Sequence, residues 1–225
     1  VPKAINLKLI PNKPKTPIPP LVLDACRKLK DTGAKTWLAG GCVRDMILGV
    51  KPRDWDIVTD APLETIRKTF PKHLEVGLSF GIVKLIPSKS ESDPAIDIAI
   101  FREESGYSDL RHPDKVEPGD ELTDSARRDF TVNALYFDPI TTVIHDYVDG
   151  YRDIGLKVLR TVGNPQERFQ EDALRILRAA RFSAQLGFKI DSETVSAMKK
   201  YSKLLSAISR ERVREETFRL LDSSR

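Results

Sequence analysis

The chain has 225 residues, of which 40% are hydrophobic and 31% are charged, and its formal net charge of +4 is compatible with a surface that handles RNA. This length allows one large domain or two small ones, and no apolar run approaches the roughly 20 residues of a membrane-spanning helix, so we expect no membrane partner. Two isolated cysteines, Cys26 and Cys42, give neither a zinc-ligand spacing nor a disulfide framework, which favours a reducing, cytoplasmic compartment.

The N-terminal part of the chain begins with a proline-rich segment. Six prolines in residues 1–20 predict an extended arm and not a folded element. Residues 21–32 have apolar side chains at helical spacing and end before Gly33, which predicts a helix. We expect a strand over residues 35–39 and a helix over residues 62–70, with a proline in its first turn.

The middle of the chain has the alternation that is typical of strands. Residues 73–87 predict a bent hairpin, and residues 95–101 alternate cleanly. Further strands are expected over residues 142–148 and 157–162. Residues 102–125 are polar and contain several Gly and Pro residues, which predicts a long loop that is either functional or mobile.

The C-terminal part is helical. Residues 165–185 predict one long amphipathic helix ended by Gly187. A second helix is expected over residues 191–205, and a third starts at Ser209. The fold class is therefore α+β: a mixed sheet with flanking helices, followed by an all-helical segment.

A glycine turn and two aspartates form the most informative segment. The sequence from Leu38 to Asp45 predicts a strand, a Gly40-Gly41 turn and a helix start, whose backbone N–H groups can hold phosphate. Asp54 and Asp56 are two apart on a strand, so both carboxylates point to one face, roughly 7 Å apart along the chain. Oxygen ligands beside a phosphate cradle are what Mg²⁺-dependent nucleotidyl transfer needs; the alternative is a turn and an acidic surface loop.

This combination resembles the first motif of the class II tRNA nucleotidyltransferases and bacterial poly(A) polymerases, in the polymerase-β-like nucleotidyltransferase superfamily. The resemblance covers roughly residues 35–218. It implies a polymerase-β-like nucleotidyltransferase head over residues 21–160 and a helical, nucleotide-reading neck over residues 161–225. Members of the family continue into body and tail domains, so we expect a chain that starts at Val1 and stops at Arg225 to be part of a longer protein.

The third acidic residue of the motif set is Asp97. Asp97 alternates with Ile96 and Ile98 on a predicted strand and therefore faces the opposite side. The resemblance implies that it joins Asp54 and Asp56 as catalytic residues and ligands of Mg²⁺, and that it helps to activate the attacking 3′-OH. The alternative is a solvent-facing strand aspartate.

The segment ARRDFTVNA, residues 126–134, resembles the motif that binds the nucleotide sugar. Arg128 can bind phosphate through two parallel N–H donors. Asp129 can accept a hydrogen bond from a ribose 2′-OH, and Asn133 is expected to share a helical face with it. The resemblance implies that these residues bind the nucleotide together with the glycine turn and Arg44; the alternative is a charged helix start.

The dipeptide Asp149-Gly150 resembles the third family motif, which acts as a hinge between head and neck. Glycine permits the backbone change that a hinge requires. Taken alone, Asp-Gly is simply a turn signal.

Residues 171–181, EDALRILRAAR, resemble the motif that reads the base. Asp172 and Arg175 are one turn apart, so they can pair with each other, and together they offer acceptors and donors to a Watson–Crick edge. In the family this pair selects CTP and ATP. Arg178 and Arg181 follow at three-residue steps and are expected to meet the triphosphate; the alternative is a surface salt bridge with a solvated arginine stripe.

The remaining motifs refine the predicted activity. Residues 209–216 resemble the last motif, which buttresses the base-reading helix. Residues 107–116 resemble the loop of CCA-adding members, although Leu110 stands where glycine is common. The resemblance therefore predicts an enzyme that adds CCA to tRNA 3′ ends from CTP and ATP, with no obligate protein partner. The alternatives are a poly(A) polymerase or A-only-adding enzyme, and a non-catalytic RNA- or nucleotide-binding module.

Overall fold

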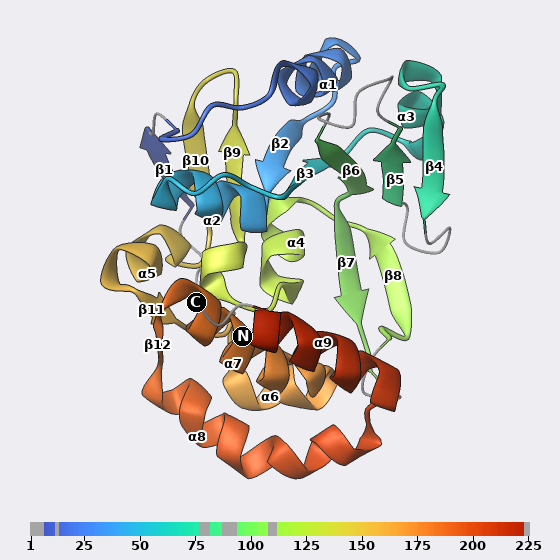
Figure 1. Ribbon diagram of the computed structural model, residues 1–225. Helices are drawn as coiled ribbons and strands as arrows, with labels where there is room; N and C mark the ends of the chain where they lie inside the picture. Colours follow the sequence, from blue (N-terminus) through green and yellow to red (C-terminus); the bar gives the residue numbers. More distant parts are fainter. Residues whose placement is uncertain (1–6, 12–13, 77–81, 87–93, 108–111, 223–225) are drawn as a thin grey trace.

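The computed structural model describes residues 7–11, 14–76, 82–86, 94–107 and 112–222 (Figure 1). Its strands are β1 (Lys8–Pro11), β2 (Thr36–Ala39), β3 (Asp54–Thr59), β4 (His73–Val76), β5 (Ile82–Leu85), β6 (Ala95–Ile100), β7 (Arg102–Ser105), β8 (Lys115–Pro118), β9 (Leu135–Asp138), β10 (Val143–Asp146), β11 (Val158–Leu159) and β12 (Lys189–Ile190). Its α-helices are α1 (Pro20–Asp31), α2 (Gly41–Leu48), α3 (Leu63–Thr69), α4 (Glu121–Arg127), α5 (Gly150–Leu156), α6 (Pro165–Glu171), α7 (Leu174–Leu186), α8 (Ser192–Tyr201) and α9 (Arg210–Asp222). In the part of the chain so described, no helix has the length and apolar character needed to cross a membrane.

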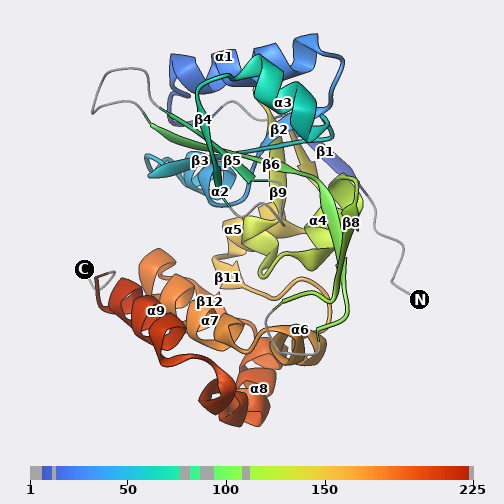
Figure 2. The same cartoon turned by 90° about the vertical axis from the view of Figure 1, so that its right-hand side faces the viewer.

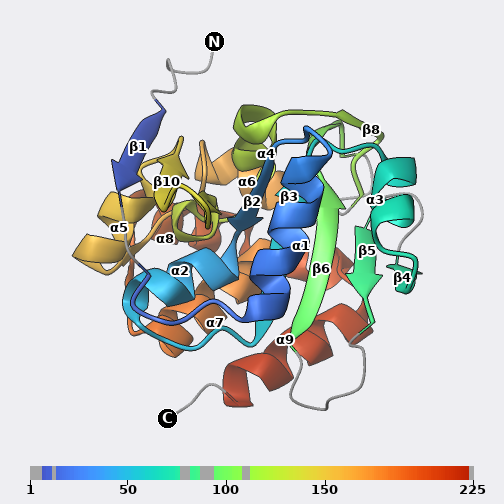
Figure 3. The same cartoon turned by 90° about the horizontal axis from the view of Figure 1, so that it is seen from above.

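The head is built on a mixed sheet, as the sequence predicts. Across the described residues the strand order is β1-β10-β9-β2-β3-β6-β5-β4, with β3 and β6 parallel and the other pairs antiparallel. Helices α1 and α2 lie across one face of this sheet (Figure 3). The inward side chains of the strands pack with these helices in the main core, and burial of that apolar area is the main stabilising term.

Alternation along the central strands places the acidic residues on the other face. Trp55 is buried in the main core, and so are Ile96 and Ile98. Because successive strand residues point to opposite faces, Asp56 and Asp97 project from the face that α1 and α2 leave free. The predicted orientation of both strands is therefore confirmed.

The helices of the neck lie at the opposite end of the molecule from α1 and α3 (Figure 2). The parallel pair β11–β12 joins the two parts, and Phe182 of α7 packs edge-on against Phe130 with ring centroids 5.8 Å apart. Phe182 and Phe188 belong to the same core cluster as the sheet. The two parts thus share one continuous apolar core, and the boundary at residues 160 and 161 stays a prediction.

The expectation that residues 1–20 hold no folded element is wrong for Lys8–Pro11. These four residues form β1, an edge strand antiparallel to β10, with Lys8 opposite Asp146. Pro11 lies at the end of the strand, where the missing N–H does least damage to a ladder. An ion pair between Lys8 and Asp149 adds a contact to the same edge.

The expectation of one long loop over residues 102–125 is also wrong. β7 and β8 form an antiparallel hairpin, and α4 follows it with a capping box in which Asp120 and Thr123 bond reciprocally. The two strands, REES and KVEP, contain one large apolar side chain, Val116, which is too little for the alternation by which sequence reveals a strand. Residues 108–111, which include Leu110, lie outside the described residues.

The single helix expected over residues 165–185 is in fact two helices. α6 ends at Glu171, Asp172 has an extended backbone with φ of −146°, and α7 begins at Leu174. The Asp172 Oδ1 atom accepts the Leu174 N–H at 3.1 Å, which satisfies one backbone donor at the start of the new helix. The second expected helix also divides, into α8 and a 3₁₀ turn, η3 (Ser202–Ala207).

Gly150 occupies a position where no side chain fits. A Cβ atom at this residue would lie 2.1 Å from the Thr131 carbonyl oxygen, which is backbone and cannot move aside cheaply. The buried Asp153, on the same helix, accepts the Thr131 hydroxyl hydrogen at 2.6 Å, so α5 is clamped against η2 (Thr131–Asn133). Glycine is therefore required here by the close approach of the Thr131 backbone and not by a positive φ. The hinge expected at Asp149 and Gly150 stays a prediction.

We expect Gly150→Ala to destabilise the protein by about 1–3 kcal/mol, because the new methyl group overpacks the contact with Thr131. The matched control is Gly155→Ala in the same helix, where a Cβ meets nothing within 4 Å. That change should be neutral or stabilising by up to about 1 kcal/mol. Chemical denaturation of both variants measures the difference, and equal stabilities would contradict the assigned contact.

Candidate active site

A cleft of about 590 Å³ lies between the free face of the sheet and the helices of the neck. Contributions come from the β2–α2 turn, β7, the α4–η2 segment, the α6–α7 break and α9. Many of the residues that the sequence singled out line it: Gly40, Gly41, Arg44, Asp56, Arg128, Asp129, Asn133, Asp172, Arg175 and Arg178. Segments far apart in the sequence therefore converge on one site.

The glycine turn lies at the head end of this cleft. Gly40 has φ of +75°, and a Cβ there would lie 3.1 Å from Arg128 Nη1 and 3.5 Å from Asp56 Oδ2. The positive φ therefore favours glycine, and the Arg128 guanidinium would have to shift slightly to admit a Cβ. α2 begins at Gly41, and the N–H groups of a first helical turn have no intrahelical partner, so they can bind an anion.

The carboxylates lie on adjacent strands beside this turn. Asp56 of β3 and Asp97 of β6 are direct register partners, and Asp54 is exposed two residues earlier on β3. Burial raises the pKa of Asp56 to about 6, against the opposing charge of Arg128, and the negative charges of Asp97 and Asp54 add to the rise. Two of the three carboxylates are thus neighbours whose charges repel each other.

Asp97 has an oxygen atom without a hydrogen bond. Its Oδ1 atom is buried and accepts none from the described residues, and the Lys84 ammonium lies 3.5 Å away. A buried, unsatisfied carboxylate oxygen next to a second carboxylate fits a divalent cation, for which oxygen is the preferred ligand. In the described residues, however, no three acidic, His or Cys side chains converge closely enough to form a metal site.

A buried aspartate outside the predicted motifs holds the arginine pair of the RRD segment. Asp124 is fully buried and accepts hydrogen bonds from Arg127 at 2.5 Å, from Arg128 at 2.9 Å and from the Tyr136 hydroxyl at 2.7 Å. Burial alone would raise the pKa of Asp124, but the two guanidinium groups hold it below its usual value. The i+3 and i+4 spacing of the two arginines is a sequence signal that could have identified it.

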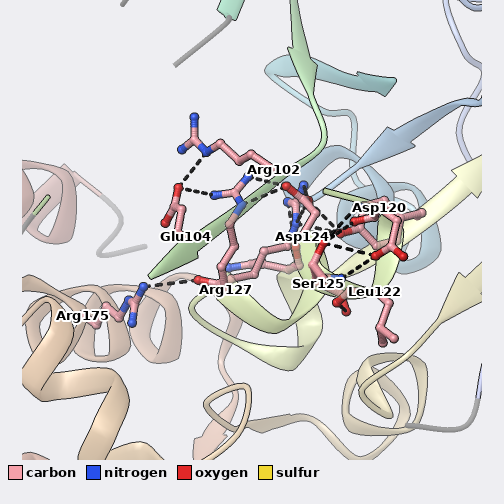
Figure 4. Close-up of polar contacts among 12 residues, drawn as sticks. Arg102, Glu104, Asp120, Leu122, Asp124, Ser125, Arg127 and Arg175 are labelled. Carbon is pink, nitrogen blue, oxygen red and sulfur yellow. Dashed lines mark hydrogen bonds and ion pairs between the residues drawn. The ribbon is translucent and has the colours of Figure 1, made fainter. Parts of the chain in front are cut away.

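The same network extends to the hairpin and to α7 (Figure 4). Glu104 of β7 accepts hydrogen bonds from Arg102 at 2.6 Å, from Tyr107 at 2.8 Å and from Arg127 at 3.2 Å. The Arg127 carbonyl in turn accepts an N–H of Arg175 at 3.3 Å. Arg127 therefore links three elements of the cleft wall.

Asp129 and Asn133 are in contact, but not on a helical face. α4 ends at Arg127, and a 3₁₀ turn carries Asn133, whose amide donates to Asp129 at 3.2 Å. Asp129 also accepts two hydrogen bonds from Arg178, at 2.5 and 2.9 Å, and these lower its pKa although burial opposes the shift. The Asn133 side-chain oxygen accepts from Arg44 at 2.5 Å.

Asp172 and Arg175 do not pair with each other, contrary to expectation. The break between α6 and α7 turns Asp172 towards α9, where its Oδ2 atom accepts from Arg212 at 2.9 Å. Arg175 donates to Glu171 at 2.6 Å and to the Arg168 carbonyl at 3.0 Å. Each base-reading candidate is therefore held by its own partner.

Arg181 lies apart from the other arginines of this motif. It is buried, pairs with Glu216 of α9, and stacks on Phe182 with its guanidinium carbon 3.9 Å from the ring centroid. Within the described residues it does not line the cleft, whereas Arg178 does. The structure thus gives Arg181 a contact between α7 and α9, and offers no support for a contact with the triphosphate.

Comparisons with known proteins agree with this arrangement. Residues 36–160 match the poly(A) polymerase head domain family, and residues 187–225 match the family described as the probable RNA and SrmB-binding site of polymerase A. The chain therefore belongs to the poly(A) polymerase head domain family of nucleotidyltransferases, as its motifs predict.

Relatives within this family are CCA-adding enzymes. The CCA-adding enzyme of Ligilactobacillus salivarius is 42% identical over 200 residues, which cover 88% of this chain and 48% of the relative. That of Enterococcus faecalis is 38% identical over 218 residues, which cover 96% of this chain and 51% of the relative. The Bacillus stearothermophilus CCA-adding enzyme in complex with CTP has a TM-score of 0.78 and 36% identity, with 88% of this chain and 47% of that one covered. The Thermotoga maritima CCA-adding enzyme complexed with tRNA_CCA has a TM-score of 0.73 and 25% identity, with 92% and 49% covered. The chain spans about half the length of the curated relatives it matches.

We expect Glu216→Leu to cost about 3–5 kcal/mol, because it leaves the Arg181 charge buried without a partner. Arg181→Met combined with Glu216→Leu should recover most of this loss and leave the nucleotide KM unchanged. Arg178→Met, which removes a cleft arginine, should raise that KM and serves as the contrast. A nucleotide KM raised equally in the double variant would show that Arg181 contacts the nucleotide after all.

We expect Asp56→Asn to stabilise the metal-free protein. The pKa of Asp56 is raised from its usual 3.8 to about 6, so the folded state binds this proton more tightly than the unfolded state. As the pH rises from about 3.8 through about 6, the proton is lost and the free energy of unfolding decreases. Asparagine does not ionise, so the Asp56→Asn variant avoids that decrease. The variant should be as stable as the unsubstituted protein near pH 4 and more stable by about 1–3 kcal/mol above pH 7. Thermal melting in EDTA across this range measures the effect, and an advantage that is independent of pH would contradict it.

Proposed function

We propose that this chain forms the nucleotide-binding and catalytic part of a template-independent RNA nucleotidyltransferase that adds CCA to tRNA 3′ ends from CTP and ATP. The observation that carries the proposal is one cleft with Asp56 and the glycine turn at one end and the separately held Asp172 and Arg175 at the other. The similarity to a CCA-adding enzyme in complex with CTP supports the choice of nucleotide.

In the proposed reaction, the 3′-OH of the RNA attacks the α-phosphorus of the nucleotide. A phosphodiester bond forms, the bond between the α-phosphorus and pyrophosphate breaks, and the hydroxyl proton passes to a carboxylate, for which Asp97 is the proposed acceptor. Asp54, Asp56 and Asp97 would hold Mg²⁺, which fits the unsatisfied Asp97 Oδ1 atom and the oxygen-only donor set. When bound, this ion supplies charge stabilisation at the phosphate oxygens.

The wall of the cleft suits a triphosphate. Among the described residues that line it, arginines outnumber carboxylates seven to four. Asp124 fixes Arg128 beside the glycine turn, and Asp129 fixes Arg178, so neither guanidinium needs to be ordered when the anion arrives. The helix N-terminus at Gly41 adds backbone donors.

The base is read by Asp172 and Arg175 in this proposal. An aspartate supplies only acceptors and an arginine only donors, so a pair held at fixed positions can distinguish Watson–Crick edges without a nucleic-acid template. Arg212 holds Asp172 and Glu171 holds Arg175, and both base-reading candidates line the cleft.

A tRNA 3′ end is the proposed partner, in keeping with the Thermotoga maritima CCA-adding enzyme complexed with tRNA_CCA. We also infer a cytoplasmic setting, since the described chain has free, buried thiols at Cys26 and Cys42 and tRNA is processed there.

The test is extension of three labelled RNAs by the protein with Mg²⁺ and CTP, ATP or both. The RNAs are tRNA lacking CCA, tRNA ending in CC, and oligo(A). We expect two C residues and one A on the first and a single A on the second. Asp54→Ala with Asp56→Ala should abolish transfer, whereas Gly155→Ala, remote from the cleft, should retain it.

Other outcomes would select the alternatives. Long A tracts on oligo(A) without incorporation of C would indicate a poly(A) polymerase, and A on the CC-ending tRNA alone would indicate an A-only-adding enzyme. Nucleotide or RNA binding without any transfer would indicate a non-catalytic module. Transfer that survives the double aspartate change would overturn the assigned carboxylates.

A further inference from the structure

We propose that an apolar strip on the free face of the sheet, formed by Leu74, Val76 and Ile82, binds the 3′-terminal nucleoside of the acceptor RNA. The inference rests on the proposed function and deepens it, because it assigns a position to the second substrate. We call these three residues the acceptor strip.

The register of the sheet places the strip on the same face as the carboxylates. β4 is antiparallel to β5, with Leu74 opposite Lys84 and Val76 opposite Ile82. Lys84 reaches to within 3.5 Å of Asp97 Oδ1, so its side chain lies on the carboxylate face. Register partners project to the same side of a sheet, and Leu74 and Val76 therefore lie on that face too.

The intervening residues confirm this orientation. Glu75 pairs with Arg67 of α3, on the other side of the sheet. Val83 and Leu85 of β5 are buried in the main core with the same helices. The alternation is therefore consistent along both strands.

The strip is exposed although its side chains are large and apolar. Leu74 is 55% exposed and Val76 is 50% exposed, and Ile82 at their side lines the cleft. The strip thus continues the cleft wall outward towards the edge of the sheet. A contiguous exposed apolar patch that is bordered by polar residues is a candidate binding surface, unlike apolar side chains scattered singly.

The order of strands indicates which substrate reaches this surface. The glycine turn follows β2, on one side of the carboxylate strands β3 and β6, whereas β5 and β4 lie on the other side (Figure 1). In phosphoryl transfer the attacking and leaving oxygens lie roughly in line on opposite sides of phosphorus. With pyrophosphate held towards the glycine turn, the 3′-OH approaches over β5 and β4.

The chemistry of the strip fits a chain end whose sequence changes. During the proposed reaction the terminal base is first that of the immature tRNA and then C and C again, so the surface must accept different bases. Aliphatic side chains pack against the face of a base or ribose without reading its edge, and such contacts tolerate sequence. Lys84, between the strip and Asp97, supplies a cation for the adjoining phosphate.

The experiment compares the double variant Leu74→Ser, Val76→Ser with the unsubstituted protein, both as the 225-residue chain. We expect the KM for tRNA lacking CCA to rise about tenfold, as for loss of one base contact, while the KM for CTP and the kcat at saturating RNA change less than twofold. Leu9→Ser is the matched control, because Leu9 is 59% exposed on β1 at the opposite edge of the same sheet.

Three outcomes would overturn the inference. An unchanged acceptor KM would exclude the contact. A lower Tm with an unchanged acceptor KM would show that the strip packs against another part of the protein. A rise in the KM for CTP equal to that for RNA would place the nucleotide there instead. Absence of transfer by the unsubstituted protein is distinguishable from these, since it would overturn the proposed function and the inference together.

Discussion

The cleft depends on one buried charge, the carboxylate of Asp124. It is fully buried and is compensated by two guanidinium groups and a phenol. A buried carboxylate without such partners would be strongly destabilising, so its presence requires Arg127 and Arg128 to keep fixed positions. In these positions the Arg128 guanidinium lies beside the glycine turn, and the Arg127 carbonyl accepts a hydrogen bond from Arg175.

This arrangement is repeated at each arginine that the base and phosphate would meet. Asp129 holds Arg178, and Glu171 holds Arg175. Pairing reduces the net positive charge of the cleft but fixes the direction of the remaining N–H donors, so little reorganisation is needed when an anion binds. The Asp129–Arg178 pair also joins the head to the neck, because its two partners come from the two parts.

Sequence alone predicted the parts of this site that depend on local periodicity. Alternation around Trp55 and around Asp97 assigned the correct face of the sheet. The RRD and ED motifs identified six of the described residues that line the cleft: Arg128, Asp129, Asn133, Asp172, Arg175 and Arg178. The sequence-based predictions were wrong where the partner of a side chain comes from a segment far away in the chain. Local spacing predicted a pair between Asp172 and Arg175. In the structure the Asp172 carboxylate instead accepts a hydrogen bond from Arg212 of α9, 40 residues away.

The other failures have a similar origin. Apolar spacing continues across the break after Glu171, so periodicity could not reveal that the backbone turns at Asp172. β7 and β8 pair with each other in a separate two-stranded sheet, and their sequences, with Val116 as the one large apolar side chain, show no marked alternation. For the same reason Glu104 and its link to Arg127 needed the three-dimensional structure.

Asp56 makes the stability of this site depend on what it binds. Its carboxylate lies beside the glycine turn, where a Cβ on Gly40 would be 3.5 Å from Oδ2. Burial raises the pKa of Asp56 to about 6 and makes its ionised form unfavourable in the folded protein. The ionised form is the one that binds a cation, so a ligand that requires it must supply the compensating free energy.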